Sequence, residues 1–122
     1  MNLAELTQAL LQFRDERNWA QFHTLRNLIV SLNLEAAELL ELTQWKSEEE
    51  MLEISGEALR DECADVLLYL LLIAEKAGID LEQAARNKLK KNAAKYPVEK
   101  SYGSSRKYTQ FTQLAQPESH ED

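Results

Sequence analysis

Hydrophobic residues recur every three or four positions along most of the chain, which is the spacing of an amphipathic helix. In the first such stretch Leu3, Leu6, Leu10 and Phe13 form one apolar stripe, separated by charged and amide side chains. Comparable stripes follow after each short polar connection. The pattern predicts helices over residues 2–18, 24–44, a short segment from 47, 57–77 and 81–95.

Local sequence also marks where these helices begin and end. Asn2, Thr24 and Asp80 are predicted N-caps, because their side-chain oxygens can accept hydrogen bonds from free backbone N–H groups. Ser47, followed three residues later by Glu50, matches a capping box. Breaks or stops are expected at Ser55-Gly56, Gly78 and Tyr96-Pro97.

The centre of the third long helix, residues 66–74, is apolar on all sides and must therefore be covered on all sides. A chain of 122 residues has few helices to cover it, so we predict a subunit interface here. Residues 1–97 are expected to form one all-α domain. Periodicity is lost in the tail, 98–122, which is expected to pack partly on a neighbouring subunit to about residue 109 and then to be disordered.

Composition narrows the class of protein. The net charge of −7 disfavours a partner that is a nucleic acid polymer. The longest apolar run is too short to span a membrane, and the charged, amphipathic first 16 residues do not resemble a signal peptide. Cys63 is the single cysteine, so no internal disulfide can form. A cytoplasmic protein is therefore expected.

Two pairs of acids interrupt the apolar stripes. Glu35 and Glu38 lie three residues apart on the second long helix, and Glu62 and Asp65 repeat this spacing on the third. Glu35 and Glu62 fall within the apolar stripes, where an uncompensated carboxylate costs several kcal/mol. A hard divalent cation such as Mg²⁺ is the expected compensation. The alternatives are a solvated helix face and a di-iron site, and the lack of suitably spaced histidines disfavours the latter.

Further side chains are candidates for binding a phosphorylated ligand. Lys88, Asn92 and Lys95 share one helix face and suit phosphate oxygens, although a solvated basic face has the same pattern. The aromatic residues Trp19, Trp45 and Tyr69 can stack on a nucleobase or belong to the core. His23 can donate a hydrogen bond to a ligand or cap a helix.

Taken in order, these motifs resemble the MazG-like all-α nucleoside triphosphate pyrophosphohydrolases. The resemblance covers about residues 3–109 and includes both acid pairs and the Lys88-x-x-x-Asn92-x-x-Lys95-Tyr96-Pro97 segment. The dCTP pyrophosphatase branch is resembled more closely, through the segments Arg17-Asn18-Trp19-x-x-Phe22-His23, Gln44-Trp45-Lys46 and Ser104-Ser105-Arg106-Lys107-Tyr108-Thr109. One departure is Leu10, where some close relatives carry a histidine.

The resemblance implies a four-helix bundle-like fold in an obligate dimer or dimer of dimers, with sites shared between chains. It implies that Mg²⁺ is held by the four acids, one of which helps to deprotonate an attacking water. It further implies that phosphate and base are bound by Trp19, His23, Trp45, Tyr69, Lys88, Asn92, Lys95 and Arg106.

The expected activity is hydrolysis of dCTP, or of a 5-modified dCTP, to the monophosphate and pyrophosphate, which would remove unwanted nucleotides from the pool. Two alternatives remain open at this point. One is a dUTP-directed hydrolase of the same fold. The other is a non-catalytic helical interaction protein in which the acid pairs are merely structural.

Overall fold

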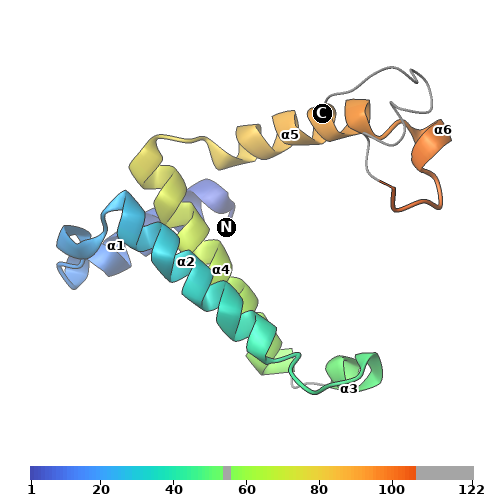
Figure 1. The fold of residues 1–122 in the computed structure, drawn as a ribbon. Helices are drawn as coiled ribbons and strands as arrows, with labels where there is room; N and C mark the ends of the chain where they lie inside the picture. Colours follow the sequence, from blue (N-terminus) through green and yellow to red (C-terminus); the bar gives the residue numbers. More distant parts are fainter. Residues whose placement is uncertain (54–55, 107–122) are drawn as a thin grey trace. The chain divides into compact units, whose positions relative to one another are not determined.

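The computed structural model describes residues 1–53 and 56–106. Its elements, in chain order, are α1 (Leu3–Glu16), the 3-10 turn η1 (Ala20–Phe22), α2 (Leu25–Glu41), α3 (Glu48–Glu53), α4 (Gly56–Ala77), α5 (Leu81–Lys95) and α6 (Val98–Ser101) (Figure 1). The described residues contain no strand. The prediction of an all-α fold is therefore confirmed.

Three of the predicted N-caps form the expected hydrogen bonds at the starts of their helices. The Asn2 side chain accepts from the backbone N–H of Glu5 at 2.8 Å, and the Glu5 carboxylate accepts in return from the Asn2 N–H. The Thr24 hydroxyl accepts from the N–H of Asn27 at 3.1 Å. Ser47 and Glu50 form a second reciprocal capping box at the start of α3. These bonds satisfy N–H groups that have no partner inside a helix.

Helix ends were predicted less well than helix starts. α2 ends at Glu41 rather than near residue 44, and the chain continues in turns to Trp45. α4 begins at Gly56, a residue expected to break the preceding helical segment. A further turn of helix, α6, follows its N-cap Pro97 in the region where the hydrophobic period is lost. At the end of α4, Gly78 adopts the expected left-handed conformation, with φ of 70°.

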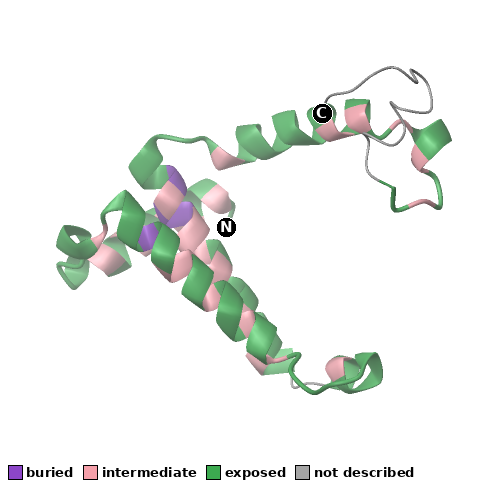
Figure 2. Cartoon of the chain, viewed as in Figure 1, coloured by how far each residue is buried: buried purple, intermediate pink, exposed green. Residues whose placement is uncertain are grey.

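The first of two compact units, Met1–Leu81, contains α1 to α4. In this unit α2 and α4 are antiparallel and pack against each other along their length (Figure 1). The part of α4 toward its C-terminus also packs against α1. The described core consists of Leu28 from α2 and Leu71, Leu72 and Ala74 from α4 (Figure 2). These four side chains gather where the three long helices meet, and they fix the register of α2 against α4.

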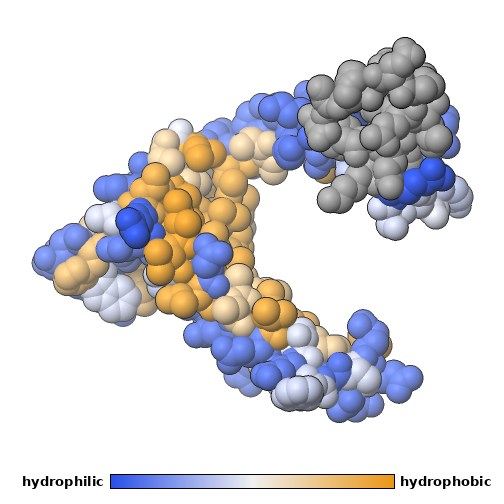
Figure 3. Space-filling view, in the orientation of Figure 1, coloured by the Kyte–Doolittle hydropathy of each residue, from blue (hydrophilic) through white to orange (hydrophobic). Residues whose placement is uncertain are grey.

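Many large apolar side chains of this unit are not covered by the chain itself. On α2 the relative exposure of Leu34 is 61% and that of Leu40 is 68%, and on α4 Leu59 and Leu67 are also exposed. Figure 3 shows hydrophobic side chains gathered on the visible face of these helices. Within the described residues, no helix is long and apolar enough to cross a membrane.

The second unit begins at Glu82 and holds most of α5 together with α6. α5 is largely exposed, and Arg86 pairs with Glu82 at 2.9 Å on its surface. The predicted domain 1–97 and its tail remain predictions. Residues 107–122 of that tail lie outside the described part of the chain, and so does Ser55 of the predicted break.

Candidate active site

The antiparallel packing of α2 on α4 brings three of the predicted acids together. Glu35 from α2 and Glu62 and Asp65 from α4 each offer a carboxylate oxygen, and these oxygens lie within 4.8 Å of one another. All three side chains are half-buried. Residues far apart in the sequence thus form one cluster, which we call the carboxylate cluster.

Glu38, the fourth predicted acid, is exposed and lies beside this cluster. This neighbouring carboxyl group raises the pKa of both Glu35 and Glu62. Glu38 follows Glu35 by one helical turn, so the same face of α2 presents the two side chains. The four acids therefore form one group at the α2–α4 contact.

Crowding and burial disfavour the ionised form of this group. Burial, then the neighbouring Glu38, then the charges of Asp65 and Glu62 raise the pKa of Glu35 to about 7. Burial and then Glu38 likewise raise the pKa of Glu62. One oxygen of each of these two carboxyls, Oε2, is shielded from solvent and has no hydrogen-bond partner among the described residues. Crowded like charges are costly, and either a proton or a cation relieves them.

The ligand atoms of the carboxylate cluster indicate which kind of cation fits it. All ligand atoms are carboxylate oxygens, which hard divalent cations prefer over nitrogen or sulfur. The unpartnered Oε2 atoms of Glu35 and Glu62 are free to coordinate such an ion. The residues present therefore fit a divalent metal of the Mg²⁺ class.

An aromatic pocket opens next to the carboxylate cluster. It consists of two adjoining hollows of about 240 and 190 Å³, which share Trp19, His23 and Tyr69. Asp65 lines the smaller hollow, so this hollow borders the carboxylate cluster. The remaining walls are formed by Leu10, Phe13, Arg14, Phe22, Asn27, Leu28, Ser31, Leu68 and Leu72. A flat organic ring suits these aromatic and aliphatic walls.

A tight turn after α1 places Trp19 in this pocket. Asn18 adopts a left-handed conformation with φ of 53°, which folds the chain back so that the Trp19 N–H donates to the Arg14 carbonyl at 3.1 Å. The Trp19 ring meets the Phe13 ring edge to face, with centroids 5.7 Å apart. The Arg17 guanidinium covers the same Phe13 ring at 3.7 Å. Trp19 is thus held by backbone and ring contacts.

His23 lines both hollows of the pocket and has one ring nitrogen without a partner among the described residues. This nitrogen, Nδ1, is shielded from solvent. Burial, followed by the charge of Arg14, lowers the pKa of His23. A neutral imidazole at this position can donate one hydrogen bond and accept another.

The other predicted site residues are not among those that line the two hollows. Trp45 lies in the turn after α2, is 91% exposed and does not line the pocket described above. Lys88, Asn92, Lys95 and Arg106 belong to the second unit, where Asn92 and Lys95 are half-buried and the other two are exposed. Their roles in binding stay predictions.

The pocket also contains residues that sequence reasoning did not assign to it. Leu10 was noted as an apolar-stripe residue and as a departure from the resemblance, Phe13 was assigned only to the apolar stripe, and Arg14 was not assigned at all. Arg14 follows Leu10 by four residues and therefore lies on the same face of α1, which is the signal that could have indicated it. Asn27 and Ser31 share a face of α2 in the same way.

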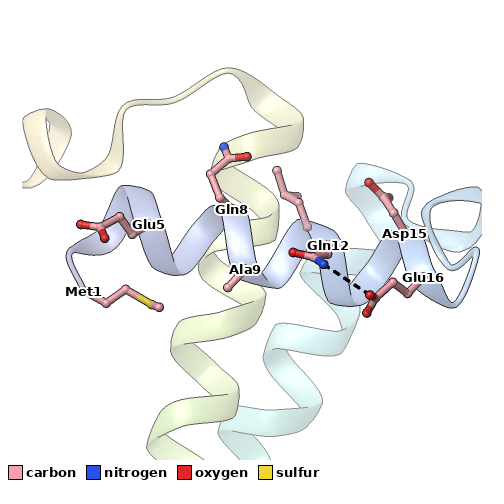
Figure 4. A pocket seen from close by; sticks show the side chains of 8 residues that line it. Met1, Glu5, Gln8, Ala9, Gln12, Asp15 and Glu16 are labelled. Atoms are coloured by element: carbon pink, nitrogen blue, oxygen red, sulfur yellow. Dashed lines mark hydrogen bonds between the residues drawn. The ribbon is translucent and has the colours of Figure 1, made fainter.

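A third hollow of about 920 Å³ runs along α1 (Figure 4). Met1 and one side of α1 line it, with polar side chains that include Glu5, Gln8, Gln12 and Glu16. Gln12 donates to Glu16 at 3.4 Å. No aromatic side chain lines it, and its acids come from a single helix, so it lacks the features of the pocket beside the carboxylate cluster.

The fold and the site together define an all-helical protein with a carboxylate cluster suited to a divalent cation beside a pocket suited to a planar ring. The sequence matches the MazG-like family over residues 30–111, a stretch that includes all four acids. The chain belongs to the MazG-like family, as the resemblance predicted.

Curated relatives share much of the sequence. The chain is 41% identical to mouse dCTP pyrophosphatase 1 over 112 residues, which is 88% of this chain and 66% of the mouse protein. It is 38% identical to human dCTP pyrophosphatase 1 over 114 residues, which is 89% of this chain and 67% of the human protein. The chain thus spans about two thirds of the length of these relatives.

A solved structure shares the fold. The crystal structure of a pyrophosphatase from Archaeoglobus fulgidus superposes with a TM-score of 0.73 at 44% sequence identity. The match covers 77% of this chain and 91% of that chain.

Proposed function

We propose that this chain is a Mg²⁺-dependent nucleoside triphosphate pyrophosphohydrolase that cleaves dCTP, or a 5-modified dCTP, to the monophosphate and pyrophosphate. The observation that carries the proposal is the carboxylate cluster beside the aromatic pocket, joined through Asp65. The names of the mouse and human relatives support dCTP as the substrate, and the archaeal neighbour, a pyrophosphatase, supports the same class of chemistry.

In this proposal Glu35, Glu38, Glu62 and Asp65 hold the cation. When bound, Mg²⁺ neutralises phosphate charge and makes a coordinated water more acidic. The residues of the chain supply position and proton transfer. Trp19 and Tyr69 hold the base next to the cluster.

Phosphate binding is assigned to the second unit. Lys88, Asn92, Lys95 and Arg106 supply cationic and amide donors that suit the charge of a leaving pyrophosphate. Trp45 is proposed to cover the base or sugar. The proposal for these five residues is supported by their side-chain chemistry and by the motifs that they share with the family.

We also propose that the active form is a dimer or a dimer of dimers. The support is the set of exposed apolar side chains on α2 and α4, since association would remove them from water. The proposed role is removal of unwanted nucleotides from the cytoplasmic pool.

The test is a panel of the common deoxynucleoside triphosphates and 5-methyl-dCTP, with Mg²⁺ or with EDTA, and with identification of the products. We expect pyrophosphate release that is greatest with dCTP or 5-methyl-dCTP and absent with EDTA. Glu35→Gln and Glu62→Gln should each lower kcat/KM about 100-fold or more, because each removes a cation ligand. Glu41→Gln, on the exposed end of the same helix α2, is the matched control and should retain activity.

Other outcomes would favour other functions. Greatest turnover of dUTP would replace the dCTP proposal by a dUTP-directed hydrolase. No turnover of any nucleotide, with the two Gln variants changed in stability alone, would favour a non-catalytic interaction protein.

A further inference from the structure

We infer that Arg14 determines base specificity, by donating two hydrogen bonds to the adjacent acceptor atoms O2 and N3 of a cytosine ring held in the smaller hollow of the pocket. The inference rests on the proposed function and names a residue that reads the substrate. Arg14 is the one cationic side chain among the described residues that line the two hollows.

The ion pair of Arg14 leaves most of its guanidinium available. Its Nε donates to Asp15 Oδ1 at 2.8 Å, and this is the single hydrogen bond of the Arg14 side chain within the described part of the chain. The side chain is 20% exposed, whereas that of Asp15 is 59% exposed. Asp15 therefore holds the guanidinium from the solvent side. The two terminal NH₂ groups are left as donors without hydrogen-bond partners among the described residues.

The surroundings of Arg14 favour a ring over a phosphate group as its ligand. Phe13, Trp19 and Tyr69 and the aliphatic Leu10 line the same hollow. Such walls suit a flat, weakly hydrated ring, whereas a phosphate is strongly hydrated and suits the cation site at the carboxylate cluster. The volume of about 190 Å³ is large enough for a nucleobase.

The donor pattern of a guanidinium then selects among pyrimidines. Arginine presents only N–H donors, in a planar fork that matches two neighbouring acceptors. Cytosine carries such a pair, O2 and N3. Uracil and thymine carry a proton on N3, so one donor of the fork would face an N–H group. Arg14 thus accepts cytosine and disfavours the other two pyrimidines.

Equilibrium binding of monophosphates tests this assignment without requiring turnover. The probes are dCMP, dUMP and 3-deaza-dCMP, in which a C–H group replaces the N3 acceptor, and binding is followed by tryptophan fluorescence. We expect wild-type protein to bind dCMP about 10-fold or more tightly than the other two, as for a bidentate arginine contact to a base. Arg14→Lys keeps the charge but loses the fork, and should reduce this ratio to near one.

Arg26→Lys is the matched control, because Arg26 is exposed on α2 and lines neither hollow. It should leave the ratio unchanged. Equal affinity of wild-type protein for dCMP and 3-deaza-dCMP, or an unchanged ratio in Arg14→Lys, would overturn the inference. The comparison of dCMP with 3-deaza-dCMP in the wild-type protein tests recognition of N3 even if a variant folds poorly. Absence of triphosphate hydrolysis in the nucleotide panel would overturn the proposed function but not the assignment of Arg14.

Discussion

At the scale of single residues, two of the predicted site residues, Glu35 and Trp45, are in unfavourable arrangements in the free protein. Glu35 lies in an apolar stripe, its Oε2 lacks a partner among the described residues, and its pKa is raised to about 7. Trp45 adopts a left-handed conformation with φ of 63° and is 91% exposed. Neither arrangement improves the stability of a subunit by itself. Departures from local rules are expected where residues serve a ligand or a partner.

The raised pKa of Glu35 makes the stability of the cation-free protein depend on pH. The folded protein binds this proton more tightly than the unfolded chain, whose ordinary value is 4.5. The contribution of Glu35 is therefore fully present below about pH 4.5 and is lost as pH rises through about 7. In EDTA we expect the urea midpoint of wild-type protein to fall more between pH 5 and 8 than that of Glu35→Gln. Equal slopes for the two proteins would contradict this expectation.

Trp45 should carry a cost in stability that its function compensates. A left-handed conformation costs roughly 1–2 kcal/mol for a bulky residue and less for asparagine. Trp45→Asn should therefore raise the free energy of unfolding by up to about 1 kcal/mol, as measured by urea denaturation. Its kcat/KM should fall if Trp45 contacts the nucleotide as proposed. A less stable Trp45→Asn variant would show that the indole makes contacts that stabilise the fold.

At the scale of elements, local sequence predicted the helix starts well and some helix ends poorly. The caps at Asn2, Thr24 and Ser47 involve residues three positions apart, so sequence alone reveals them. The end of α2 at Glu41 has no glycine or proline to mark it. It depends instead on where the chain must turn toward α3. Helix ends of this kind depend on tertiary packing, and the spacing of hydrophobic residues does not predict them.

The Thr24 cap should stabilise the start of α2. Thr24→Ala removes the oxygen that accepts from the Asn27 N–H and should lower the free energy of unfolding by about 1 kcal/mol. Thr24→Ser keeps this oxygen and should stay near wild type. Thermal or urea unfolding of both variants measures the difference. A similar loss in both would assign the effect to the threonine methyl group.

At the scale of the whole molecule, the described part of one chain leaves many large apolar side chains exposed. The described core contains four side chains, whereas Leu34 and Leu40 on α2 and Leu59 and Leu67 on α4 are exposed. The apolar centre of α4 was predicted from sequence to lie at a subunit interface. That prediction stays a prediction, and the exposed face of α2 extends the surface on which a second copy is proposed to pack.

Leu40→Glu should weaken assembly more than it weakens the subunit. The side chain is 68% exposed in one chain, so a charge there is readily solvated unless another subunit covers it. We expect a shift to smaller species in sedimentation velocity. Gln8→Glu, on the polar side of α1, is the control and should keep the wild-type mass. Retention of the full assembly by Leu40→Glu would place the interface elsewhere.

The sequence by itself determined the helical class, the starts of most helices and the two acid pairs, because each depends on spacings within one or two helical turns. It also indicated Trp19, His23 and Tyr69 as ligand-binding candidates. The tertiary structure alone decided that Glu35 lies beside Glu62 and Asp65, and that Arg14 lies in the same pocket as His23. It also showed that Trp45 does not line this pocket. The register between two helices is fixed by side chains that pack across long stretches of chain, and no local period encodes it.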